Sequence, residues 1–177
     1  MDRTAAGAIV IVGLLVVLAL LWVAWRRRSR RDAGILPGYP LPATPGALLA
    51  AADGFYVATT RRDQPLERLA IRGLGFRARA HVAVHDDGLV LSLAGEEPRF
   101  IPAGGIETVA RATWTIDRVV KSDGLLLVGW QAATADAAGV AVDSYLRIVD
   151  TGDRERIIQA LTRIAPVTAA GTTESEA

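Results

Sequence analysis

Histidine and carboxylate side chains, which often carry catalysis or metal binding, meet in one short stretch of the sequence. His81 and His85 lie four residues apart, and Asp86 and Asp87 follow directly. In an alternating segment both histidines would share one face of a strand, roughly 13 Å apart, which is too far to share a metal ion. Asp-Asp-Gly is typical of a tight turn. We therefore expect surface histidines beside a turn, and no metal site.

Motifs that activate a nucleophile or hold a nucleotide are also missing. The chain has no cysteine, and none of its serines stands in a Gly-x-Ser-x-Gly or Ser-x-x-Lys pattern. The glycines of Gly73 to Phe76 fall short of the Gly-x-Gly-x-x-Gly phosphate loop, because Ala78 stands where the third glycine would be. We expect no catalytic residues and no cofactor, and the chain is not predicted to be an enzyme.

Arg77 and Arg79 form the strongest candidate for anion binding. They alternate with Ala78 and Ala80, so both should point outward on the same face as His81. Two neighbouring guanidinium groups could hold the phosphate of an anionic lipid headgroup. The competing interpretation is two solvated surface arginines. Residues 48–166 carry 14 basic and 15 acidic residues, a net charge of −1, which argues against a nucleic-acid partner.

The N-terminal part of the sequence predicts a transmembrane helix. The 21 residues from Ala5 to Trp25 contain no charged side chain, and as a helix they would span roughly 31 Å, the thickness of the hydrocarbon core. A cleaved signal peptide would have a shorter apolar run and a cleavage site between small residues. We therefore expect residues 5–25 to be an uncleaved anchor.

The basic residues that follow this segment indicate its orientation. Cationic flanks are retained on the cytoplasmic side, so residues 1–4 are expected outside the cell membrane and the remaining chain in the cytoplasm. Indole rings favour the membrane interface. The predicted membrane-interface residues are Trp22, Trp25, Arg26, Arg27, Arg28, Arg30 and Arg31.

The segments on either side of the expected domain are predicted to be a spacer and a tail. Residues 26–47 begin with the arginines and contain Pro37, Pro40, Pro42 and Pro45, which predicts a semi-rigid extended spacer that holds the domain away from the bilayer. Residues 167–177 show no apolar periodicity and are expected to be a disordered tail. The domain itself is assigned to residues 48–166.

Alternating apolar residues predict about seven short strands in that domain. The first clear hairpin joins Arg77–His85 to Leu89–Leu93, with Val82, Val84, Leu91 and Leu93 on its buried face. The last element is an amphipathic helix in which Ile157, Ile158, Leu161 and Ile164 share one face, and Pro166 stops it. The sequence thus predicts a mainly β small barrel with a C-terminal helix.

A second predicted hairpin suggests where a partner could dock. It pairs Trp114–Lys121 with Leu125–Ala132 around Asp123-Gly124, and this register leaves apolar residues on the face opposite the core. An exposed apolar strip commonly marks an interaction site. The predicted docking or self-association surface consists of Val119, Leu126, Val128 and Trp130. The alternative is that another part of the fold covers this strip.

The order of strands and helix is similar to the pleckstrin-homology (PH) superfold. Four segments carry a closer likeness: GFYVATT at Gly54–Thr60, GLGFRARAHVAV at Gly73–Val84, FIPAGGIETV at Phe100–Val109 and GLLLVGW at Gly124–Trp130. Through them the whole chain resembles a bacterial, mainly actinobacterial, group of short single-pass membrane proteins with a cytoplasmic PH-like domain. The resemblance implies a fold and a location, and little about chemistry.

These observations together favour an interaction module. We expect a membrane-anchored PH-like domain that holds an unidentified protein partner at the cytoplasmic face of the cell membrane. One alternative is a module that binds anionic lipid headgroups through Arg77 and Arg79. Another alternative is an accessory subunit of a membrane transporter, assembled through the helix in the bilayer.

Overall fold

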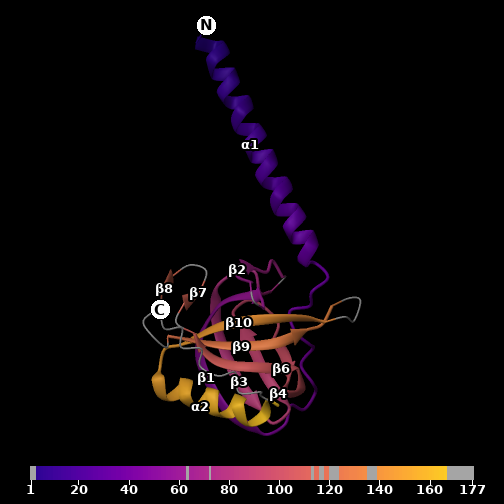
Figure 1. Ribbon diagram of the computed structural model, residues 1–177, viewed down its shortest axis with the longest axis vertical. Helices are drawn as coiled ribbons and strands as arrows, with labels where there is room; N and C mark the ends of the chain where they lie inside the picture. Colours follow the sequence, from indigo (N-terminus) through magenta and orange to yellow (C-terminus); the bar gives the residue numbers. More distant parts are fainter. Residues whose placement is uncertain are drawn as a thin grey trace, which may run out of the picture.

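The computed structural model describes residues 3–62, 64–71, 73–112, 114–115, 118–119, 124–134 and 139–166. A long helix, α1 (Arg3–Asp32), projects from a β-rich body that ends in a second helix, α2 (Thr151–Ile164) (Figure 1). The strands are β1 (Leu48–Arg61), β2 (Gln64–Arg68), β3 (Ala78–His85), β4 (Gly88–Leu93), β5 (Arg99–Pro102), β6 (Ile106–Ala112), β7 (Trp114–Thr115), β8 (Arg118–Val119), β9 (Leu125–Ala132) and β10 (Val140–Ile148). The tail predicted over 167–177 lies outside the described residues.

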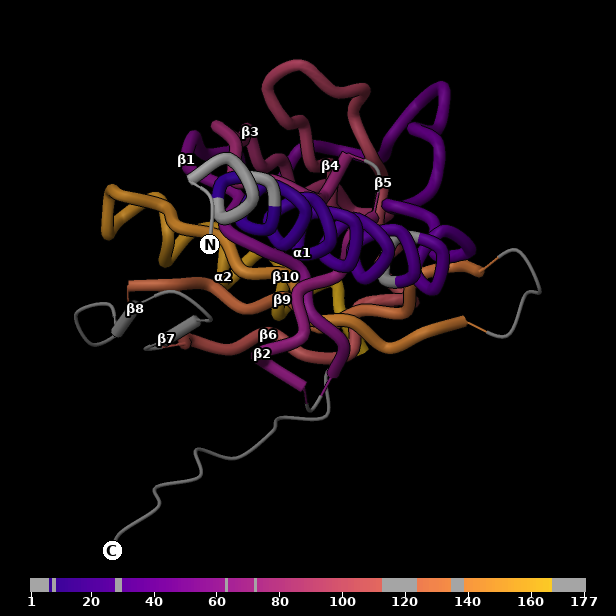
Figure 2. Tube along the Cα trace, turned by 90° about the horizontal axis from the view of Figure 1, so that it is seen from above, coloured from indigo at the N-terminus to yellow at the C-terminus, as the bar shows by residue number. Residues whose placement is uncertain are grey.

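One antiparallel sheet of eight strands forms the body, in the order β5-β4-β3-β1-β10-β9-β6, with β2 attached to β1. Strand β1 is shared by both halves of the sheet, because its first part pairs with β3 and its last part with β10. A bulge between Tyr56 and Ala58 marks the change of partner. Figure 2 shows β3, β4 and β5 on one side of the body and β6 and β9 on the other. The predicted mainly β architecture is confirmed.

Helix α2 covers one end of the sheet, opposite the end from which α1 leaves (Figure 1). It buries Ile157, Ala160 and Leu161 in the common core, as the spacing of its apolar residues predicted. Asp150 caps its first turn by accepting a hydrogen bond from the Asp153 backbone N–H at 2.8 Å. The predicted C-terminal amphipathic helix is therefore confirmed.

The first predicted hairpin exists, with its register displaced by two residues. Val84 pairs with Leu89 and Val82 with Leu91, so that Asp86 and Asp87 form the turn. Because side chains alternate with a period of two, an even displacement leaves every residue on its predicted face. The apolar face of this hairpin is buried in the core, as expected.

The second predicted hairpin is wrong. Strand β9 pairs with β6, where Val128 faces Val109 and Leu127 faces Ala110, and residues 120–123 lie outside the described part of the chain. Leu126, Val128 and Trp130 point into the core and are at most 1% exposed, so they cannot form the predicted docking surface. The fourth residue of that surface, Val119, lies in the separate pair β7–β8, whose side chains are outside the described residues.

The predicted spacer packs against the domain. Ile35 is buried and bridges to Thr134, while Tyr39 and Phe100 exchange backbone hydrogen bonds of 2.8 and 2.9 Å. The prolines do favour extended backbone, but burial of Ile35 and the backbone hydrogen bonds of Tyr39 hold this extended segment against the sheet. Residues 33–40 therefore hold the domain close to α1.

A buried carboxylate attaches α1 to the domain. Asp32, the last residue of the helix, is fully buried, and its oxygens lie 3.2 Å from Arg61 Nη2 and 3.2 Å from the backbone nitrogen of Ala70. The residue before it in the same helix, Arg31, forms an ion pair with Glu67 at 3.0 Å. These contacts join the C-terminal end of α1 to the ends of β1 and β2, and we refer to them as the Asp32 junction.

A buried polar network stabilises the centre of the body. The Tyr56 hydroxyl donates to the Leu74 carbonyl at 2.8 Å and lies 2.9 Å from Thr59 Oγ1. Thr59 in turn contacts Ser144 Oγ at 2.8 Å, which accepts a hydrogen bond from Trp130 Nε1 at 3.0 Å. Burial raises the pKa of Tyr56 to about 12. All four side chains are thus satisfied within the core.

This raised pKa predicts alkaline destabilisation. Folding favours the neutral phenol, so its contribution to the free energy of unfolding is complete below pH 10 and is lost as the pH rises from about 10 to about 12. Urea unfolding of the full chain in detergent should show this decline. Tyr56→Phe should flatten it, and should lower stability at pH 7 by about 1 kcal/mol because the Leu74 carbonyl loses its donor.

The matched control is Tyr39→Phe, which removes the hydroxyl of an exposed tyrosine and should leave both quantities unchanged. Parallel pH profiles for the wild type and Tyr56→Phe would contradict the assignment.

Candidate interaction groove

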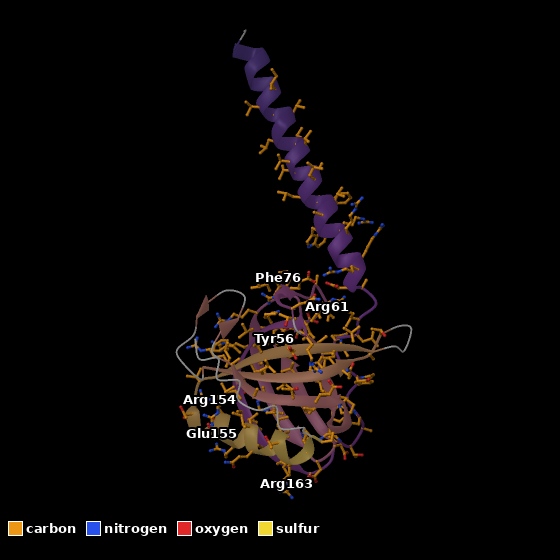
Figure 3. All side chains as sticks on the ribbon, in the orientation of Figure 1. Tyr56, Arg61, Phe76, Arg154, Glu155 and Arg163 are labelled. Atoms are coloured by element: carbon orange, nitrogen blue, oxygen red, sulfur yellow. The ribbon has the colours of Figure 1, made fainter. Side chains whose placement is uncertain are left out.

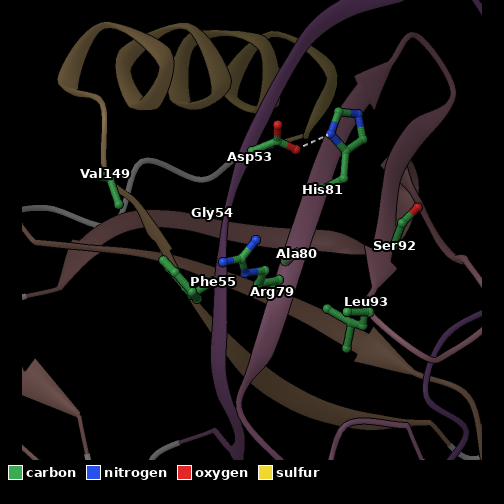
Figure 4. A pocket seen from close by; sticks show the side chains of 10 residues that line it. Asp53, Gly54, Phe55, Arg79, Ala80, His81, Ser92, Leu93 and Val149 are labelled. Atoms are coloured by element: carbon green, nitrogen blue, oxygen red, sulfur yellow. Dashed lines mark hydrogen bonds and ion pairs between the residues drawn. The ribbon is translucent and has the colours of Figure 1, made fainter.

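A groove of about 600 Å³ lies on the outer face of β1, β3 and β4 (Figure 4). The register of β1 and β3 sets its floor, because Asp53 pairs with His81, Gly54 with Ala80 and Phe55 with Arg79. Residues directly opposite each other on antiparallel strands project to the same side. Every second position of each strand therefore contributes a side chain to the groove, while the residues between them face the core.

Polar groups line the end of the groove that is nearer to α2. His81 Nδ1 lies 2.7 Å from Asp53 Oδ1, and Ser92 of β4 is paired with His81 in the ladder (Figure 4). The second histidine, His85, contacts the backbone oxygen of Gly46 at 2.8 Å instead. The structure thus gives the two histidines separate local partners, in line with the expectation that they do not act together.

Three arginines surround the aromatic ring at the middle of this face. Phe55 pairs with Arg79 on one side and with Arg147 of β10 on the other. The guanidinium of Arg77 lies over the ring, 5.4 Å from its centroid, within the range of a cation–π interaction. All three arginines are exposed, and none forms an ion pair with another described residue. We call this group the Phe55 cluster.

The predicted pair Arg77 and Arg79 thus does share an outer face, as the alternation indicated. The sequence did not point to Phe55 or to Arg147, which reach the same place only through the pairing of β1 with both neighbours. Val149, 66% exposed, closes one end of the groove just before α2 begins. The site therefore combines unpaired positive charge with exposed apolar surface.

Helix α1 carries the predicted membrane-interface residues. Over Ile9–Asp32 it is long and apolar enough to cross a membrane by length and composition, which is compatible with a single-pass anchor. Trp22 and Trp25 are exposed, and Arg26 stacks on the Trp22 ring at 5.3 Å. Of the other arginines, Arg27 and Arg31 line a cleft beside Leu66, Arg30 is exposed, and the side chain of Arg28 is not among those described.

Comparison with protein-family models gives a match. The family model described as bacterial PH domain-like matches residues 33–162, which covers the whole sheet and most of α2. No curated protein matches the chain.

The floor of the groove depends on a glycine, which leads to a stability prediction. A Cβ atom added to Gly54 would lie 2.5 Å from the Arg147 backbone oxygen, and a backbone atom in a paired strand cannot turn aside. Gly54→Ala should lower the free energy of unfolding by about 1 to 3 kcal/mol. Gly104→Ala, where nothing lies within 4 Å of the new atom, should change it by less than about 0.5 kcal/mol. Chemical denaturation in detergent measures both, and equal effects would contradict the packing described here.

Proposed function

The chain belongs to the bacterial PH domain-like family, and on this premise we propose that it is a membrane-anchored interaction module that holds a protein partner at the cytoplasmic face of the cell membrane. In this proposal the domain binds without catalysing a reaction. Helix α1 provides the anchor, and the Phe55 cluster with its groove provides the binding surface.

The single observation that carries the proposal is the composition of the Phe55 cluster. Arg77, Arg79 and Arg147 gather around one aromatic ring, while Asp53, the acid that lines the same groove, is engaged by His81. Unpaired guanidinium groups favour carboxylates as ligands, and the partly exposed ring of Phe55 favours apolar contact. The partner is therefore expected to offer an acidic segment that also contains an apolar side chain.

The distance from the bilayer favours a protein over a lipid headgroup at this place. Phe76 lies at the α1 end of the domain, and Arg79 lies three residues later within β3, so Arg79 is up to about 10 Å farther from that end. The headgroup layer is only about 5 to 8 Å thick on each side of the hydrocarbon core. The groove continues away from α1 through the row of Asp53 and His81. A partner in the cytoplasm reaches this surface more readily than a headgroup does.

Photo-crosslinking in native membranes tests the binding surface. A photoreactive side chain introduced at Phe55 should give a covalent protein adduct, whereas the same probe at exposed Arg163 on α2 should not. The double variant Arg79→Glu/Arg147→Glu should abolish the adduct at position 55, because it replaces attraction of an acidic segment by repulsion.

The control for this experiment is Arg79→Lys/Arg147→Lys, which keeps both charges and should retain most of the adduct. The same adduct from position 163, or an adduct unaffected by charge reversal, would contradict the assignment of the groove. An adduct to lipid in place of protein would favour headgroup binding.

The orientation of α1 gives a second prediction. Five arginines follow the apolar segment and one precedes it, so the domain should lie in the cytoplasm. A reporter that fluoresces only in the cytoplasm, fused after Ala177, should be bright. A dark reporter at full expression, or cleavage of the domain by protease added to intact spheroplasts, would place the domain on the other side.

A further inference from the structure

Two large apolar side chains remain exposed at the end of the domain from which α1 leaves. Phe76 is 86% exposed and Leu66 is 68% exposed, and neither belongs to the core. Figure 3 shows Phe76 at the top of the domain, on the side of α1 and near Arg61. Leu66 lines a cleft with Arg27 and Arg31 of the helix. These residues together with Arg77 are called the α1-side rim.

The Asp32 junction sets the distance between this rim and a bilayer crossed by α1. Trp25 is the last residue of the uncharged segment, and Asp32 follows seven residues later in the same helix. Seven helical residues correspond to roughly 10 Å. The headgroup layer is about 5 to 8 Å thick. Asp32 is buried against the end of β1, so the rim beside it lies close to the outer surface of the headgroup layer.

The chemistry of the rim suits that depth. Leu66 lines a cleft of about 410 Å³ together with Arg27, Arg31 and Glu67. Glu67 is paired with Arg31, so Arg27 and Arg77, which directly follows Phe76, are the cations of this rim without an ion-pair partner among the described residues. Surfaces that lie in the membrane interface combine apolar side chains with cationic ones, which approach the phosphates of anionic lipids. A rim that faced only water would gain nothing from exposing two large apolar side chains, Phe76 and Leu66, at this end of the domain.

We propose that the α1-side rim is a second contact with the membrane, in which Phe76 and Leu66 enter the headgroup layer of the bilayer that α1 crosses. The inference rests on the membrane-spanning part of the proposed function. It adds a fixed orientation, because a helix and a rim together hold the domain at a defined angle. The Phe55 cluster then faces sideways along the membrane surface, toward partners that are themselves held at the membrane.

Site-specific fluorescence tests this proposal, and the absence of cysteine from the chain makes labelling selective. The full chain carrying Phe76→Cys is labelled with an environment-sensitive fluorophore and reconstituted into vesicles of phosphatidylcholine and phosphatidylglycerol. We expect a blue-shifted emission, and loss of that emission when the lipids carry a nitroxide quencher on their headgroups. Leu66→Cys should behave in the same way.

The matched control is Val149→Cys, which is 66% exposed and lies between the end of β10 and the start of α2, the helix at the end of the domain opposite α1. Its probe should keep a water-like emission and show no quenching by the headgroup-labelled lipid. Equal quenching at positions 76 and 149 would overturn the proposal. A blue shift at position 76 without quenching would also overturn it, because burial would then be against protein, such as a second copy of the chain.

Vesicle flotation separates failure of the rim from failure of the anchor. If the labelled chain floats with the vesicles after a carbonate wash but position 76 is not quenched, α1 spans the bilayer and the rim proposal is wrong. If the chain does not float, the anchor of the proposed function is wrong and the rim proposal fails with it. Flotation together with quenching at positions 66 and 76, but not at 149, supports the rim contact.

Discussion

The buried carboxylate of Asp32 is the contact on which the arrangement of the whole chain depends. A charge without access to water is costly unless it is paired and hydrogen-bonded, and here Arg61 and the Ala70 backbone N–H supply both conditions. If the helix end moved away from the domain, Arg61 would lose its ion pair and Ala70 its acceptor. Helix α1 and the sheet are therefore expected to move together. The distance between the groove and the C-terminal end of α1 is then set by the fold.

Periodicity in the sequence predicted the elements better than it predicted their partners. The hairpin of β3 and β4 kept its buried face because its register error was an even number of residues, which does not exchange the two sides of a strand. For strand β9 the periodicity did not predict the buried face. Residues 125–128 are all apolar, so no alternation of apolar and polar residues distinguishes one face of the strand from the other. The actual partner, β6, decides that Leu126, Val128 and Trp130 point inward.

The segment between α1 and β1, and the Phe55 cluster, also contain contacts that the sequence pattern did not predict. Proline fixes an extended backbone, but it does not determine whether that backbone lies in water or against a sheet, and Ile35 and Tyr39 make the difference here. Alternation was enough to place Arg77 and Arg79 on one face. Their neighbours Phe55 and Arg147 come from strands distant in the sequence, so their proximity follows from sheet pairing alone.

Net charge concealed the most informative feature of the domain. A total of −1 over residues 48–166 suggested ordinary surface arginines, yet two sets of three arginines differ clearly in their partners. Arg61, Arg62 and Arg111 are paired with acids and link separate segments of the chain. Arg77, Arg79 and Arg147 have no such partner among the described residues and stand around Phe55. Like charges held together repel one another, and an exposed cation–π contact returns only about 0.5 to 1 kcal/mol. The fold gains little from this grouping, so its benefit is expected to lie in what binds there.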